Sequence, residues 1–193
     1  MILWRTNLEL DEAILDTVIE AIDGNPRRIG MKGMFTSFFA DTVNEREEVV
    51  FASQYKKVIA DGFHALGIQH RSGYSFDHWT QVYSDGNVGH TPHDHYKPHV
   101  IVSWVHFVRP TSTPAFHFLD SNYNKTYPEQ NPGDFIMFNS WALHGVDPSK
   151  EYRAVIAGNV YLKDLVSPAD IDISLHTHFE GDTFTQKQIK GML

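Results

Sequence analysis

Histidine is the residue type that points most directly to chemistry in this sequence. The chain contains 12 histidines among its 193 residues and no cysteine. Half of the histidines fall within one internal segment: His90, His93, His95, His99, His106 and His117. Neutral imidazole is the commonest protein ligand for metal ions, and an internal cluster is not a purification tag. The segment therefore predicts a metal site.

The spacing of His93 and His95 favours a shared ligand role. Side chains two residues apart in an extended strand point to the same face, so both imidazoles can reach one metal ion while Asp94 points away. A third ligand must come from elsewhere, and His144, which follows the apolar run 133–138, is the best candidate. Three ligands on neighbouring strands leave coordination positions open, as in catalytic metal sites.

Arg153 lies nine residues after His144, on a predicted strand over residues 152–162. Such a strand would return beside the histidine. A guanidinium group matches the two oxygens of a carboxylate, so Arg153 is a candidate anchor for an acidic ligand. The structural alternative is an ion pair with Asp147 or Glu151, which would contribute little at a surface.

Two helices are predicted in the first part of the chain, after a short strand over 2–5. Asp11 can cap the first helix, in which Ile14, Leu15, Val18 and Ile22 recur at helical spacing before a Gly-Asn-Pro stop. Residues 25–42 are expected to form a loop or an extended segment. The second helix is predicted over 45–66, with an apolar stripe composed of Val49, Val50, Tyr55, Val58, Ile59, Phe63 and Leu66.

From residue 73 the pattern changes to short β-branched and aromatic runs separated by turn residues. These runs cover 74–83, 99–108, 115–119, 133–138, 142–146 and 152–162. Together they predict a mainly β fold with flanking α-helices, namely a double-stranded β-helix of the jelly-roll or cupin-like kind. We expect one domain over 1–193, with helical support in 1–72, the β-helix core and site in 73–163, and a C-terminal extension in 164–193.

Composition excludes several function classes. The net charge of −8 without a basic run disfavours nucleic-acid binding, and the lack of cysteine excludes disulfides, iron–sulfur clusters and thiolate nucleophiles. No apolar run reaches the length of a membrane span, and the first residues do not form a signal peptide. A soluble, cytoplasmic protein without a membrane partner is expected.

The pattern over roughly residues 79–162 resembles the non-haem iron(II)- and 2-oxoglutarate-dependent oxygenases, within the prolyl hydroxylase-like superfamily. It is most similar to a group of bacterial and phage oxygenases in that superfamily, which would place a phage-encoded member in the host cytoplasm. The resemblance rests on matching residues in chain order: Tyr83, His93, His95, Pro132, Gly133, Asp134, Phe138, Ser140, Trp141, His144, Val146, Pro148, Arg153 and Asn159.

This resemblance implies specific roles. His93, His95 and His144 would hold iron(II), and Arg153 would bind the far carboxylate of the cosubstrate 2-oxoglutarate, with Tyr83 and Asn159 in the same cosubstrate site. The implied reaction hydroxylates a substrate C–H bond and releases succinate and CO2. Peptidyl proline is the nearest guess for the substrate, and a small-molecule substrate stays equally open.

Three positions depart from the superfamily pattern. His95 replaces the usual carboxylate ligand, Phe107 stands where a tyrosine often contacts the cosubstrate, and Val155 replaces a serine that commonly follows the arginine. Either His95 completes the ligand set or, if a bulge rotates the strand, Asp94 does. Asp94 could instead supply charge from outside the ligand set. The native metal is open in the same way, and Arg153 is expected to act with His106 or Tyr83.

Two other functions fit the same sequence. One is a three-histidine, cupin-like metalloenzyme that does not use 2-oxoglutarate, and the other is a non-catalytic jelly-roll structural or binding module. The pair His176 and His178 copies the ligand spacing without a partner strand, so it is expected to lie on the surface. Five aromatic residues are expected mainly to fill the barrel, with some at the mouth of the pocket: Trp79, Trp104, Trp141, Phe116 and Phe118.

Overall fold

The computed structural model describes residues 2–41, 45–67, 74–84, 88–97 and 100–162. The predicted extension over 164–193, with His176 and His178, lies outside these residues, as does His99. The strands in the described part are β1 (Ile2–Asn7), β2 (Ile29–Met31), β3 (Met34–Thr36), β4 (Tyr74–Tyr83), β5 (Val88–His93), β6 (Val100–Arg109), β7 (Phe116–Leu119), β8 (Lys125–Thr126), β9 (Asp134–Asn139), β10 (His144–Ser149) and β11 (Arg153–Leu162). The helices there are α1 (Glu12–Ile22), α2 (Ala52–Ala65) and the 3-10 helices η1 (Pro26–Arg28) and η3 (Glu47–Phe51).

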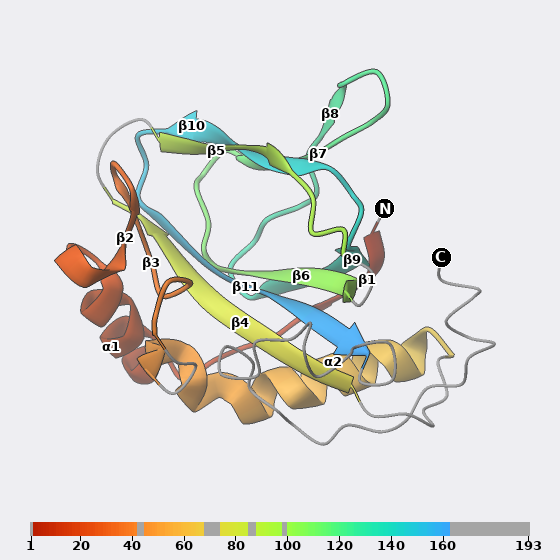
Figure 1. Ribbon diagram of the computed structural model, residues 1–193, viewed down its shortest axis with the longest axis horizontal. Helices are drawn as coiled ribbons and strands as arrows, with labels where there is room; N and C mark the ends of the chain where they lie inside the picture. The colour runs from red at the N-terminus through yellow and green to blue at the C-terminus, as the bar shows by residue number, and fades with distance from the viewer. Residues whose placement is uncertain (1, 42–44, 68–73, 85–87, 98–99, 163–193) are drawn as a thin grey trace.

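The strands form two antiparallel sheets that face each other. The larger sheet has the order β1-β9-β6-β11-β4-β3-β2, and the smaller has the order β5-β10-β7-β8. Figure 1 shows the smaller sheet above one face of the larger sheet, while α1 and α2 cover the opposite face. The prediction of a mainly β fold braced by N-terminal helices is therefore confirmed.

The first helix forms where the sequence predicts it. The carboxylate of Asp11 accepts the backbone N–H of Ile14 at 3.1 Å, and the buried face includes Leu15, Val18 and Ile22. Ile14, expected in the apolar stripe, is instead 44% exposed. Because each residue turns a helix by about 100°, Ile14 lies at the edge of the buried face, which is centred on Leu15, Val18, Ile19 and Ile22.

The second predicted helix is divided in the structure. The 3-10 helix η3 precedes α2, and this tighter turn changes which residues face inward. Val50, expected in the apolar stripe, is 55% exposed, whereas the carboxylate of Glu48 is fully buried. From Tyr55 onward the predicted stripe packs against the larger sheet as expected.

The larger sheet is buried on both faces, so its strands contribute to two apolar clusters. On β6, Val102 and Trp104 belong to the cluster under the helices, while Val105 and Phe107 belong to the cluster between the sheets. Phe116 and Phe118 from β7 fill this second cluster from the smaller sheet, as predicted. Trp141, however, is 51% exposed and does not fill the barrel.

No helix among the described residues has the length and apolar character that crossing a membrane would need.

Candidate metal centre and adjoining cavity

Three histidines converge at one end of the space between the sheets. One ring nitrogen from each of His93, His95 and His144 lies within 4.8 Å of the others. His93 on β5 pairs directly with His144 on β10, so strand pairing brings these two side chains together. His95 lies two residues beyond β5, where its backbone N–H donates to the carbonyl oxygen of Ser140 at 2.8 Å. This bond ties the segment to the connection between β9 and β10 although β5 has ended.

Hydrogen bonds set the same tautomer in all three rings. Nδ1 of His93 lies 3.0 Å from the carbonyl oxygen of Thr91, and Nδ1 of His144 lies 2.8 Å from that of Ala142. A carbonyl oxygen only accepts, so each Nδ1 carries the proton and each Nε2 keeps its lone pair. Nδ1 of His95 donates in the same way to Oδ1 of Asn159 at 2.8 Å. Three neutral imidazoles with free Nε2 atoms form a ligand set suited to a divalent transition metal.

Burial keeps the rings of His95 and His144 neutral. Burial first, and the neighbouring His93 second, lower the pKa of His95 to about 4 and that of His144 to about 3. Both rings are therefore uncharged at neutral pH, as metal binding requires. Trp79 stacks on His95 with ring centroids 5.9 Å apart and an interplanar angle of 10°, which holds the ring in place.

Asp94 lies outside this cluster. Its side chain is exposed, and Oδ1 accepts the backbone N–H of Tyr96 at 3.0 Å. This local bond satisfies the carboxylate where the chain turns after β5. The structure therefore brings His95, and not Asp94, together with His93 and His144.

Arg153 is a buried cation with an unsatisfied hydrogen-bond donor. Its residue is 4% exposed, and its Nη2 has no hydrogen-bond partner within the described part of the chain. Nη1 lies 3.5 Å from the backbone oxygen of Asp147, whose carboxylate binds Lys125 instead. The alternative of an ion pair with Asp147 or Glu151 is thus not what the structure shows. The guanidinium lies 3.7 Å above the ring of Tyr83, which pairs with Arg153 across β4 and β11.

A mostly apolar cavity connects the three histidines with this arginine. Its wall includes the predicted site residues His93, His95, His144, Arg153 and Tyr83, together with Phe107 and Val155. An unpaired buried N–H costs free energy that an acidic ligand in the cavity would recover. The donor set thus fits a divalent metal ion, and the unpaired guanidinium fits the far carboxylate of a chelating diacid.

Two residues expected near the cosubstrate lie elsewhere: His106, a candidate helper of Arg153, and Asn159, predicted for the cosubstrate site. His106 points to the opposite face of β6, where Nδ1 is 3.0 Å from the hydroxyl of Tyr55 and Nε2 is 2.9 Å from the backbone oxygen of Leu8. The expectation that His106 assists Arg153 is therefore wrong, because strand alternation directs Val105 and Phe107 into the cavity. Asn159 contacts His95 and is not among the residues that line the cavity at Arg153.

Sequence reasoning missed Gln81, which also lines the cavity. Its Oε1 accepts the hydroxyl of Tyr83 at 3.1 Å and so helps to hold that ring against Arg153. The signal was available, because Trp79, Gln81 and Tyr83 alternate along β4 and must share one face. His90 lines the same cavity, with its ring centroid 4.4 Å from that of His93, and burial lowers its pKa to about 4.

A second, more open hollow adjoins the cavity at the histidines. It shares five lining residues with the cavity: Trp79, Gln81, His90, His93 and His95. The remaining wall comes largely from β2, β3 and the segment that follows them, including the exposed rings of Phe38 and Phe39. His93 and His95 thus line both the first space, the inner cavity, and the second, the outer groove, whereas His144 lines the inner cavity alone.

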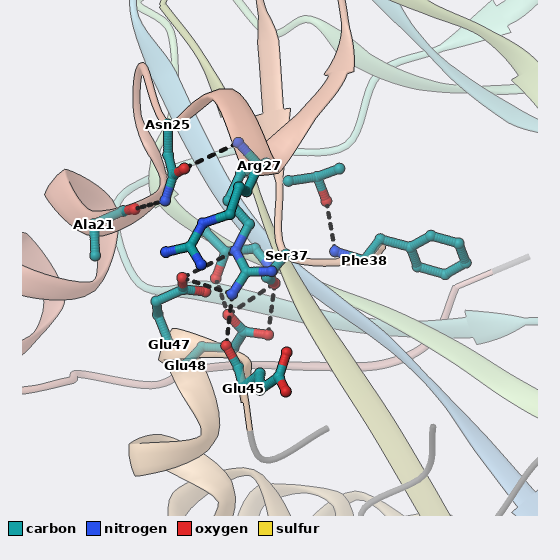
Figure 2. A network of polar contacts seen from close by, with 11 residues as sticks. Ala21, Asn25, Arg27, Ser37, Phe38, Glu45, Glu47 and Glu48 are labelled. Carbon is teal, nitrogen blue, oxygen red and sulfur yellow. Dashed lines mark hydrogen bonds and ion pairs between the residues drawn. The ribbon is translucent and has the colours of Figure 1, made fainter. Parts of the chain in front are cut away.

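Buried polar contacts fix the segment that carries Phe38. The hydroxyl of Ser37 donates to both carboxylate oxygens of Glu48, at 2.7 and 2.9 Å. Figure 2 shows this contact. Thr80 on β4 donates its hydroxyl to the same carboxylate at 3.0 Å. Phe38 packs edge-on against Trp79, with ring centroids 5.1 Å apart. The wall of the outer groove is therefore tied to the strand that carries Trp79.

Comparison with solved structures places this fold. It is similar to a prolyl-4-hydroxylase from Pseudomonas putida, with 13% identity and a TM-score of 0.56 over 82% of this chain and 91% of that chain. It is also similar to a Trichoplax adhaerens prolyl hydroxylase solved with a hypoxia inducible factor peptide fragment, with 13% identity and a TM-score of 0.59 over 83% and 84% of the two chains. A non-heme alpha-ketoglutarate-dependent epimerase from nogalamycin biosynthesis matches with 13% identity and a TM-score of 0.57 over 95% and 90%.

No family model and no curated protein matches the sequence. The similarity to the solved structures shows that the chain has the double-stranded β-helix fold of the prolyl hydroxylase-like 2-oxoglutarate oxygenases, as its sequence predicts.

Proposed function

We propose that this protein is an iron(II)- and 2-oxoglutarate-dependent oxygenase that hydroxylates a C–H bond of its substrate and releases succinate and CO2. The observation that carries the proposal is the cavity that connects three convergent imidazoles with a buried guanidinium whose Nη2 lacks a partner. A metal site alone does not require a buried guanidinium. A diacid that chelates the metal requires both the three imidazoles and the guanidinium.

The residues of this chain would contribute binding, orientation and exclusion of water. His93, His95 and His144 would hold the metal through Nε2, and Arg153 would fix the far carboxylate of the cosubstrate. Phe107 and Val155 present apolar surface to the cavity, which strengthens the charge pairing of Arg153. When bound, iron and 2-oxoglutarate supply oxidation of the substrate coupled to decarboxylation of the cosubstrate.

The outer groove is the proposed site for the main substrate. It shares His93 and His95 with the inner cavity, whereas Arg153 lines the inner cavity alone, so substrate and cosubstrate would occupy separate spaces beside the metal. One similar structure was solved with a peptide and another is an epimerase, so the fold accommodates different substrates and outcomes. Hydroxylation of peptidyl proline stays a prediction.

Anaerobic titration of the iron(II)-loaded protein with 2-oxoglutarate tests the proposal directly. We expect a visible charge-transfer band, because chelation of iron by the keto acid produces one, and we expect Arg153→Met to weaken it. Arg109→Met is the matched control, since Arg109 binds Glu12 and Asp16 on the surface of α1. A folded, iron-loaded protein without the band would favour the cupin-like enzyme that does not use 2-oxoglutarate.

A further inference from the structure

The buried carboxylate of Asp77 is connected by hydrogen bonds to His95, the histidine that replaces the usual acidic ligand. Asp77 on β4 is 4% exposed and pairs directly with Asn159 on β11. Its Oδ1 accepts the backbone N–H of Asn159 at 3.0 Å, and its Oδ2 accepts the hydroxyl of Tyr161 at 3.0 Å. Asn159 in turn contacts His95. Asp77 is therefore connected to the candidate ligand through two intervening side chains.

The direction of each hydrogen bond in this chain follows from Asp77. A carboxylate only accepts, so the Tyr161 hydroxyl must donate to it, and burial raises the pKa of Tyr161 so that the hydroxyl keeps its proton. The Tyr161 oxygen is then an acceptor for Nδ2 of Asn159, which lies 3.4 Å away. With Nδ2 directed to Tyr161, the amide oxygen of Asn159 faces His95.

This orientation decides which nitrogen of His95 is available to a metal. Oδ1 of Asn159 accepts, so Nδ1 of His95 donates to it and Nε2 carries the lone pair. If the amide were reversed, its NH2 group would face Nδ1, the proton would move to Nε2, and the ring could not bind the metal through that atom. Ser103 also contacts Oδ1 of Asn159, at 2.8 Å, but a hydroxyl either donates or accepts and cannot set the direction.

We infer that Asp77 is a positioning residue for the metal site: acting through Tyr161 and Asn159, it fixes the metal-binding tautomer of His95 and supplies the carboxylate charge that a three-imidazole ligand set lacks. The inference rests on the proposed metal site. It assigns to Asp77 the compensating role considered for Asp94, whose exposed carboxylate is bound to the backbone of Tyr96.

The tautomer of His95 can be measured without metal. Long-range proton–nitrogen NMR spectra of the metal-free protein distinguish the two neutral tautomers, and a His95→Gln variant identifies the signals of that ring. We expect the Nδ1–H form in the wild-type protein. The hydrogen bonds from Asp77 through Tyr161 and Asn159 to His95 form a relay. In Asp77→Asn the new NH2 group would donate to Tyr161, the direction of each hydrogen bond in this relay would reverse, and an Nε2–H signal of His95 would appear. Ser103→Ala is the matched control and should keep the Nδ1–H form.

Metal affinity gives the second measurement, with cobalt(II) as the probe. Loss of residues that hydrogen-bond to a metal ligand typically weakens metal affinity by about 10-fold to 100-fold, and we expect a decrease of this size for Asp77→Asn. Tyr161→Phe breaks the same relay and should weaken binding in the same direction, without adding to the effect of Asp77→Asn. It also serves as the second variant if Asp77→Asn fails to fold, which circular dichroism would show.

The outcomes separate the relay from the proposed function. A wild-type His95 in the Nε2–H form, or a fully retained Nδ1–H form in both Asp77→Asn and Tyr161→Phe, would overturn the relay whether or not metal binds. Wild-type protein with the expected tautomer but no affinity for cobalt(II) would overturn the metal site and, with it, the role of Asp77 in metal binding.

Discussion

At the scale of single residues, Arg153 is a buried cation in unfavourable surroundings. It is buried, its Nη2 is unpaired within the described residues, and it shares a largely apolar cavity with Phe107 and Val155. Burial lowers the pKa of Arg153, yet a guanidinium stays charged at neutral pH. Such a group destabilises the folded state but favours binding of an acidic ligand. Replacing Arg153 should therefore lower ligand affinity without lowering stability.

Arg153→Met tests this separation. Removing the buried donor takes away an unsatisfied polar group, so we expect the melting temperature of the ligand-free protein to be unchanged or higher. Affinity for 2-oxoglutarate should fall by at least about 30-fold, because losing one partner of a buried charge pair costs about 2 kcal/mol or more. Calorimetric titration of the metal-loaded protein measures the affinity, and undiminished binding by Arg153→Met would remove the residue from the cosubstrate site.

The histidines allow a comparison between a proposed ligand and a close neighbour. His144 belongs to the convergent group, whereas His90 lies beside His93 without belonging to it. Mutation of residues that hydrogen-bond to a metal ligand weakens metal affinity by about 10-fold to 100-fold, so loss of the ligand itself should weaken it more. We therefore expect His144→Ala to lose cobalt(II) binding and His90→Ala to retain it, as followed by the visible spectrum of the bound ion. Equal loss in both variants would contradict the three-residue assignment.

At the scale of strands and helices, the local residue pattern along each strand accounts for the strand ranges that the sequence could predict. The range 74–83 expected for β4 agrees with the structure, and the expected strand over 152–162 agrees with β11 to within one residue. Both strands are long and rich in β-branched and aromatic residues, so local sequence and tertiary pairing agree. The pairing of His93 with His144 depends on contacts between β5 and β10, which no local pattern contains. The relay from Asp77 to His95 was unpredictable for the same reason.

The division of the predicted helix over 45–66 has a physical cause that the apolar pattern conceals. Arg46 donates Nη1 to the backbone oxygen of His78 at 2.5 Å, and the carboxylate of Glu48 accepts hydroxyl groups from Ser37 and Thr80. These long-range polar contacts bury the charged side chains of Arg46 and Glu48. The apolar pattern of the sequence instead predicts that Val50 is buried. The buried residue is therefore Glu48, and Val50 faces solvent.

Glu48 should make stability depend on pH in a direction unusual for a carboxyl group. Burial raises its pKa from 4.5 to about 7, although the hydrogen bond from Ser37 opposes this shift. Between these values the unfolded chain releases the proton that the folded protein retains. The contribution of Glu48 is therefore present at low pH and is lost as pH rises from about 4.5 to 7, by about 3 kcal/mol at most.

Urea unfolding of wild-type protein and Glu48→Gln at pH 5 and pH 8 measures this contribution. Burial lowers the pKa of His78 and His106 to about 4, so both favour the folded state more as pH rises. That effect is common to both proteins, and only the difference between them reports on Glu48. The exposed neighbour Glu45 provides the control change to glutamine. A difference between wild type and Glu48→Gln that does not vary with pH would exclude the proposed titration.

At the scale of the whole molecule, the two sheets face each other while helices cover the far face of the larger sheet (Figure 1). The inner cavity and the outer groove meet at Trp79, His93 and His95. Strands from both sheets contribute to the site, since β5 and β10 carry two of the histidines and β11 carries Arg153. A ligand that bridges the histidines and Arg153 would thus connect the two sheets.

Such bridging predicts that stabilisation by ligands is sequential. A ligand at 100 times its Kd stabilises the folded state by about 3 kcal/mol, which corresponds to about 5–10 °C in melting temperature for a chain of this size. We expect metal to raise the melting temperature by itself and 2-oxoglutarate to raise it further only after metal is present. Glutarate has the far carboxylate without the keto acid, so it should give a much smaller second increment. In Arg153→Met the first increment should remain and the second should disappear. A full increment from 2-oxoglutarate in metal-free protein would show that the diacid binds without the histidines, and the connection between the two sheets would then have to be rejected.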